Sequence, residues 1–225
     1  MSIDQRRRQR KLERKAAKRR AALLEKRTAT GHASGLFKYA HFEAAITAPI
    51  HECLVPANLF RIGIGNVVFS RRFGDGRIVF GAFLLDVFCL GVKDAVFAIM
   101  SNSEFYLRKS EMNRRASFIV RPPSYARKLV EDAVAYASAL GFVPHPDYQV
   151  AKQIFGDVDA SECHDVFVFG DKGKPHFIAG PHDSPARCQR IMSTLEARLG
   201  RNGFHYLIAI NRADLDDLDF AGEED

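Results

Sequence analysis

The fold is decided by residues 78–88, which read IVFGAFLLDVF. Apolar residues occupy both of the alternating sets of positions, so a strand formed by this stretch would be buried on both faces. Such a strand belongs in the interior of a sheet, where other strands and covering layers surround it. We therefore predict that residues 78–88 form an interior strand and that the rest of the chain folds around it.

A hairpin is predicted on the N-terminal side of this strand. Ile62, Ile64 and the segment 67–69 have the β-branched and aromatic character of a strand. The stretch FGDGR at 73–77 is rich in residues that tolerate a positive φ, which favours a tight turn. The two apolar stretches are therefore expected to pair in an antiparallel manner.

The apolar pattern changes on the C-terminal side of the strand. Residues 89–91 interrupt it, and the apolar stretch 92–100 that follows predicts a buried helix. Residues 101–121 are polar and are expected to be irregular, apart from a strand at 117–120.

Two helices have clear boundaries in the sequence. A helix at 124–140 follows two prolines and ends before a glycine, the pattern favoured at helix starts and ends. A second helix, at 185–199, also ends before a glycine, and either Asp183 or Ser184 can cap its start. A shorter helix is predicted at 147–155.

The order of the elements predicts an α+β fold. A second hairpin is expected at 166–179, and a last strand at 204–210. Residues 67–100 and 166–199 would then share the order strand, turn, strand, helix, although hairpins followed by helices are common enough to arise by chance. We predict a mixed, mainly antiparallel sheet built from two such ββα units, with a protruding basic N-terminal helix.

Charge divides the chain into three parts. Residues 1–30 form a predicted basic helical arm, whose first 27 residues carry 12 Lys and Arg against three acidic residues. Residues 31–210 are predicted to form a single globular domain, with 44–120 and 121–210 as its two potential halves. Residues 211–225 have one basic residue against seven acidic ones and predict a disordered acidic tail that could neutralise the arm.

The arm predicts binding to a polyanion. Ala, Leu and Gln between the charges favour a helix with positive charge on all sides. Nucleic acid is the default polyanion, and RNA, including that of a ribosome, is favoured over DNA because no groove-reading helix is recognisable. The residues expected to contact phosphates are Arg6, Arg7, Arg8, Arg10, Lys11, Arg14, Lys15, Lys18, Arg19 and Arg20.

A small hydrolase or nuclease is the alternative function. Asp86 interrupts an apolar strand, and a carboxylate there must be paired, bound to a metal or placed at the exposed end of the strand. The structural interpretation pairs it with Lys93 or with backbone N–H groups, and the functional one makes it an active-site carboxylate with a nearby cation. If the segment around residue 51 lies beside this strand, His51, Cys53 and Cys89 could approach Asp86 and supply a base and a thiol nucleophile. These five residues are the candidate catalytic set, and a purely structural role for Asp86 is the competing interpretation.

A phosphate site is a further hypothesis at the start of the helix predicted at 185–199. Ser184, Arg187 and Arg190 lie in or next to its first turns, where unpaired N–H groups and arginine favour an anion. The competing interpretation is an ordinary capped helix.

No motif in the sequence indicates a cofactor or a metal. The four cysteines form no C-x-x-C pair, and without a recognisable signal peptide they are expected to be reduced thiols in a cytoplasmic protein. No apolar run is long enough and sufficiently free of charge to predict a membrane span. A third hypothesis is a protein-interaction module whose arm and tail contact partners.

Overall fold

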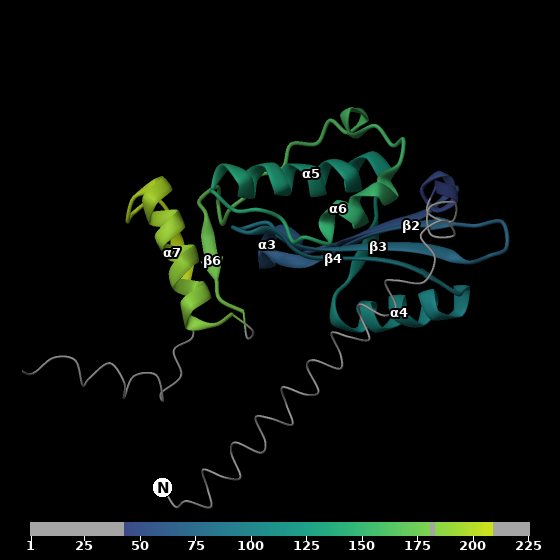
Figure 1. The fold of residues 1–225 in the computed structure, drawn as a ribbon, viewed down its shortest axis with the longest axis horizontal. Helices are drawn as coiled ribbons and strands as arrows, with labels where there is room; N and C mark the ends of the chain where they lie inside the picture. The colour runs from purple at the N-terminus through teal and green to yellow at the C-terminus, as the bar shows by residue number, and fades with distance from the viewer. Residues whose placement is uncertain (1–42, 181–182, 209–225) are drawn as a thin grey trace, which may run out of the picture. The chain divides into compact units, whose positions relative to one another are not determined.

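A computed structural model describes residues 43–180 and 183–208 of the chain (Figure 1). The predicted basic arm and the predicted acidic tail both lie outside these described residues. The chain divides into two compact units, Met1–Ala44 and Ala45–Asp225. All of the strands and helices named below belong to the second unit.

The second unit combines helices with a mainly antiparallel sheet, so the fold is α+β as predicted. Its main sheet has five strands in the order β4-β3-β2-β1-β5, and every neighbouring pair is antiparallel. Four consecutive strands therefore form a meander, and β5 is added beside β1. The strands are β1 (Ile50–Pro56), β2 (Ile64–Arg72), β3 (Ile78–Asp86), β4 (Gly91–Met100) and β5 (Phe118–Val120).

The hairpin predicted around residues 73–77 is confirmed by the pairing of β2 with β3. Gly76 has a φ of 86°, which a glycine adopts without strain. Asp75 Oδ1 accepts the backbone N–H of Arg77 at 3.0 Å and fixes the turn. β3 lies between β2 and β4, and eight of its nine residues are buried. The prediction of an interior strand buried on both faces is therefore correct.

The prediction of a helix at 92–100 is wrong, because strand β4 occupies this segment and pairs with β3. Without β4, the backbone N–H and C=O groups along one edge of the buried β3 would lack partners. Val96, Phe97 and Ile99 are also residue types that favour a strand. The need to complete the sheet therefore determines the conformation of this apolar segment.

The prediction that residues 101–115 are irregular is also wrong, because they include helix α4 (Asn102–Arg115). The helix begins at a capping box: the Ser101 hydroxyl accepts the N–H of Glu104 at 3.2 Å, and Glu104 accepts the N–H of Ser101 at 2.8 Å. Phe105 is the one fully buried residue of this helix. A single buried side chain explains why the sequence shows no apolar face here.

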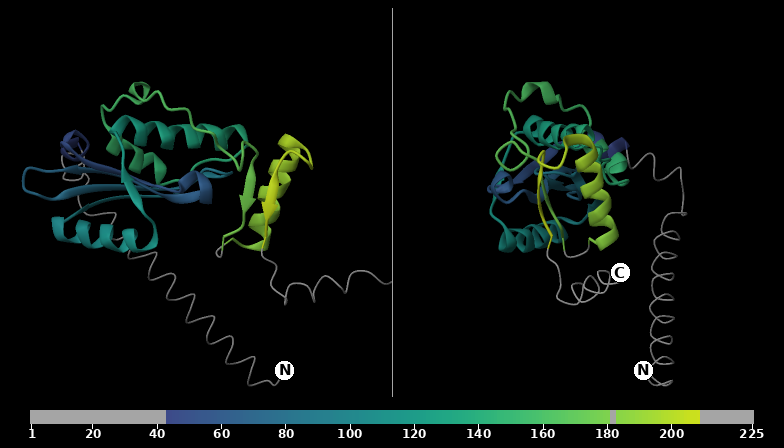
Figure 2. Two further views of the ribbon diagram at one scale, coloured as in Figure 1. Left: turned by 180° about the vertical axis from the view of Figure 1, so that it is seen from behind. Right: turned by 90° about the vertical axis from the view of Figure 1, so that its left-hand side faces the viewer.

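Helices cover both faces of the main sheet (Figures 1 and 2). Helix α5 (Pro123–Ala139) and the short α6 (Tyr148–Ala151) lie over one face, and α4 lies over the other. A 3₁₀ turn (Lys152–Phe155) extends α6, so the helices predicted at 124–140 and 147–155 are both confirmed. The larger core lies between the sheet and α5, and a smaller core containing Phe105 lies under α4.

A separate small core lies beside the turn that joins β3 to β4. β6 (His176–Ile178) and β7 (His205–Leu207) pair in parallel, and the predicted helix α7 (Pro185–Leu199) packs its buried residues in the same cluster as Phe177. The strand predicted at 204–210 is confirmed for its described part. Cys89 at the end of the β3–β4 turn also belongs to this cluster.

The two ββα units are not confirmed. Residues 67–100 contain three successive strands rather than a hairpin and a helix. The predicted hairpin at 166–179 is wrong, because β6 pairs with β7 and the segment 166–169 belongs to no strand. A short turn does form between Asp171 and Lys174, so the turn is correctly predicted and the strand pairing is not.

Candidate functional site

The residues of the predicted catalytic pocket lie at different ends of the sheet. Cys53 of β1 is opposite Phe69 of β2, whereas Asp86 of β3 is opposite Ile64 of β2. The offset along β2 corresponds to about 17 Å at the usual rise of a strand. The structure therefore does not bring His51 and Cys53 to Asp86, and the predicted pocket around these residues is not assembled.

His51 instead contributes to the contact between β1 and α4. Its ring makes edge contacts with Phe105 at 5.5 Å and Tyr106 at 6.3 Å between ring centroids. The neighbouring Glu52 Oε2 lies 2.6 Å from Lys109 Nζ of the same helix. Both side chains therefore attach α4 to the sheet.

Asp86 closes the turn that follows β3. Its Oδ1 accepts the backbone N–H of Phe88 at 3.1 Å and of Cys89 at 2.9 Å. Burial raises the pKa of the Asp86 carboxyl, while these hydrogen bonds and the charge of Lys93 act in the opposite direction. The contacts match the structural interpretation of Asp86, in which backbone N–H groups satisfy the carboxylate.

The two thiols of the predicted pocket are poor nucleophiles. Cys53 and Cys89 are both buried. Burial raises the pKa of the Cys53 thiol to about 12 and raises the pKa of Cys89 as well. Because the thiolate is the reactive form, neither cysteine is suited to attack a substrate at neutral pH.

Lys93 and the predicted phosphate site share one ion cluster at the start of α7. Lys93 Nζ lies 3.6 Å from Asp183 Oδ2, and Arg187 Nε lies 3.0 Å from Asp183 Oδ1. The Ser184 hydroxyl accepts the N–H of Arg187 at 3.3 Å and so caps the helix. Asp183 is thus the shared carboxylate partner of both cations, and Arg190 is exposed on the same helix. These contacts favour the capped-helix interpretation over a phosphate site.

A groove of about 350 Å³ lies between α4 and the start of β2. Arg108 and Arg115 of α4 bring positive charge to it, opposed by Glu111. Ile62, at the end of the short helix α3 (Leu59–Ile62), and Ile64 are 46% and 43% exposed there. The groove therefore combines arginine with uncovered apolar surface, a combination that no sequence pattern predicts.

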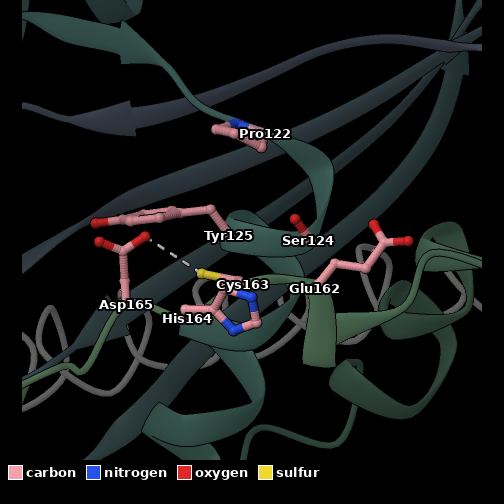
Figure 3. Close-up of a pocket in the computed structure, with 7 residues that line it drawn as sticks. All are labelled: Pro122, Ser124, Tyr125, Glu162, Cys163, His164 and Asp165. Carbon is pink, nitrogen blue, oxygen red and sulfur yellow. Dashed lines mark hydrogen bonds between the residues drawn. The ribbon is translucent and has the colours of Figure 1, made fainter.

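A second pocket, of about 430 Å³, lies at the N-terminus of α5 (Figure 3). Pro122, Ser124 and Tyr125 form one part of its wall, and the segment 162–165 forms another. Within this segment, the Cys163 thiol donates to Asp165 Oδ2 at 3.4 Å. The Arg121 guanidinium lies 4.9 Å from the centroid of the Tyr125 ring. The pocket therefore offers hydrogen-bond donors of a helix start together with carboxylates.

One group of potential metal ligands occurs among the described residues. Asp94, His145 and Asp147 offer ligand atoms within 4.8 Å of one another, and both carboxylates are exposed. His145 Nδ1 accepts the backbone N–H of Asp147 at 3.3 Å. The lone pair that would bind a metal at this nitrogen is therefore already used.

Comparisons with protein-family models, with curated proteins and with solved structures find no match to this chain. The helices that the structure describes include none that is long and apolar enough to cross a membrane. Within the part of the chain that the structure describes, the groove and the α5 pocket are two sites whose geometry bears on function.

Proposed function

We propose that the protein binds RNA, with the basic arm contacting phosphates and the α4 groove contacting both the backbone, through its arginines, and the bases, through its apolar surface. The observation that carries this proposal is the density of charge in the arm, 12 Lys and Arg within the first 27 residues. A segment of this composition attracts any polyanion, and binding releases the counterions condensed on the nucleic acid. The arm supplies affinity without sequence preference.

The groove supports the choice of RNA with unpaired bases. Single-stranded RNA is held by cationic side chains that contact the backbone and by surfaces against which bases pack. Arg108 and Arg115 offer the cations, and the exposed faces of Ile62 and Ile64 offer the apolar surface. Asn66, which also lines the groove, offers an amide that can hydrogen-bond a base edge.

The enzyme hypothesis has less support among the described residues. The Asp86 carboxylate accepts backbone N–H groups of the turn after β3, and the His51 ring packs against α4. Cys53 and Cys89 are buried thiols whose pKa values are raised. A basic groove without an adjoining catalytic carboxylate pair or base favours binding over hydrolysis.

Replacing both groove arginines tests this proposal. The double variant Arg108→Gln/Arg115→Gln is expected to weaken binding to a fluorescein-labelled single-stranded RNA by about ten-fold. The slope of log Kd against log salt concentration should also decrease by about 0.7 for each phosphate contact that is removed. Fluorescence anisotropy at several salt concentrations measures both quantities.

The matched control is Arg77→Gln/Arg201→Gln, which removes the same charge from the β2–β3 turn and from the turn that follows α7. This control is expected to retain most of the affinity. If both double variants lost the same affinity for RNA, only the net charge of the protein would matter. That result would contradict a role for the groove.

A further inference from the structure

The first turn of α5 has backbone donors without acceptors inside the helix. Pro122 occupies the cap position and offers no capping side chain, and Pro123 has no N–H. The first intrahelical bond runs from the N–H of Ala126 to the C=O of Pro122 at 3.2 Å. The N–H groups of Ser124 and Tyr125 therefore remain at the helix start, where the helix dipole favours a negative group.

The Ser124 hydroxyl provides a second and independent indication of a ligand. Ser124 is only 9% exposed, and it lines the pocket at the start of α5 (Figure 3). Its side chain has no hydrogen-bond partner among residues 43–180 and 183–208, unlike the capping hydroxyls of Ser101 and Ser184. The hydroxyl therefore keeps its donor and its acceptor available to an anionic group bound in the pocket.

The other wall of the pocket carries negative charge. Glu162 and Asp165 both line it, and both are exposed. Arg127 pairs with Glu131 and Lys128 pairs with Asp132, and among residues 43–180 and 183–208 neither Glu162 nor Asp165 forms an ion pair, including with Arg121 beside Tyr125. The carboxylates of the 162–165 segment are therefore available to a positively charged ligand.

These two walls select the charge of the ligand. A simple anion would be attracted by the α5 N-terminus but repelled by Glu162 and Asp165, and a simple cation would meet the opposite conflict. We propose that the pocket binds a free α-amino acid, with its carboxylate at Ser124 and its ammonium group at Glu162 and Asp165. The remaining volume, beside Pro122 and Tyr125, accommodates the side chain.

Cys163 contributes a neutral surface to this site. Burial raises the pKa of its thiol, so the group stays protonated and donates to Asp165. The thiol therefore orients the carboxylate that would accept the ammonium group, and it takes part in no covalent step.

Saturation-transfer NMR of the full-length protein with pools of the free α-amino acids tests the proposal. At least one amino acid is expected to bind, and its N-acetyl and carboxamide derivatives should each bind about ten-fold or more weakly, because each lacks one charged hydrogen-bonding group. An absence of saturation transfer from every pool at millimolar concentration would overturn the proposal. Equally tight binding of the N-acetyl derivative would also overturn the proposal. This derivative lacks the ammonium group, so the pocket would then recognise only the carboxylate.

Substitutions locate the binding to this pocket. Ser124→Ala and Asp165→Asn are each expected to lower the affinity for the tightest-binding amino acid by about ten-fold. Both variants should keep the melting temperature of the wild type. Ser138→Ala, on the exposed far end of α5, and Glu196→Gln, on the exposed surface of α7, are the controls and should bind as the wild type does. Unchanged binding by Ser124→Ala would contradict the site. The assay contains no RNA, so its outcome is separate from that of the RNA-binding proposal.

Discussion

Deletion of residues 1–27 is expected to lower the affinity for single-stranded RNA by about 100-fold or more. The deletion removes 12 basic and three acidic residues, and with each missing phosphate contact the counterion release that drives binding also decreases. The α4 groove alone retains two arginines, opposed by one glutamate, and so supports only weak binding. Fluorescence anisotropy with the same labelled RNA gives both affinities.

The deletion is expected to leave the folded domain intact, because the compact unit that contains every named strand and helix begins at Ala45. A matched control replaces Arg6, Arg7 and Arg8 with Gln and should cause a smaller, graded reduction. Unchanged RNA affinity after removal of the whole arm would contradict the assignment of phosphate contacts to it.

Arg71→Met is expected to lower the free energy of unfolding by about 3–5 kcal/mol. Arg71 is 3% exposed, and its guanidinium donates to three backbone carbonyls, Ile154 at 2.7 Å, Ala48 at 2.7 Å and Phe155 at 2.8 Å. Methionine fills a similar volume but removes these three donors; the Phe155 oxygen still accepts the N–H of Val158 at 3.2 Å, whereas the Ile154 and Ala48 oxygens lose the side-chain donor that Arg71 supplies. Urea unfolding followed by circular dichroism measures the decrease.

The neighbouring Arg72 supplies the control for this substitution, because its side chain is exposed. Arg72→Met is expected to change the free energy of unfolding by less than about 0.5 kcal/mol. If Arg71→Met lowered the free energy of unfolding by less than about 1 kcal/mol, water would have replaced the guanidinium as the donor. That result would contradict the role of Arg71 as the link between β2 and the turn after α6.

Local patterns predict the elements whose own residues determine their structure. The interior strand at 78–88 and the α5 helix after Pro122 both follow from periodicity and end signals. The apolar residues of segment 92–100 satisfy the period of a helix as well as that of a strand, and only the unpaired edge of β3 decides between them. The capping box at Ser101 and Glu104 is a usable signal for α4 that the polarity of the segment conceals.

The candidate sites are harder to predict for a similar reason. Asp86 is recognisable from the sequence as a buried carboxylate that needs partners, and the structure supplies them within the adjacent turn. The α5 pocket joins Ser124 to Asp165, about forty positions apart in the sequence. Its only local signal is the pair of prolines that leaves the helix start without a capping side chain. Contacts between segments that are distant in the sequence can be recognised only once the three-dimensional fold is known.

The salt dependence of RNA binding by the full-length protein is the decisive measurement of whether the arm contacts phosphates. Binding through several arm residues predicts a slope of log association constant against log salt of about −4 or steeper between about 50 and 200 mM KCl. Anisotropy titrations with single-stranded RNA and with single-stranded DNA of the same sequence give this slope, and RNA is expected to bind more tightly. A slope near zero, or binding to neither nucleic acid at low salt, would contradict the account.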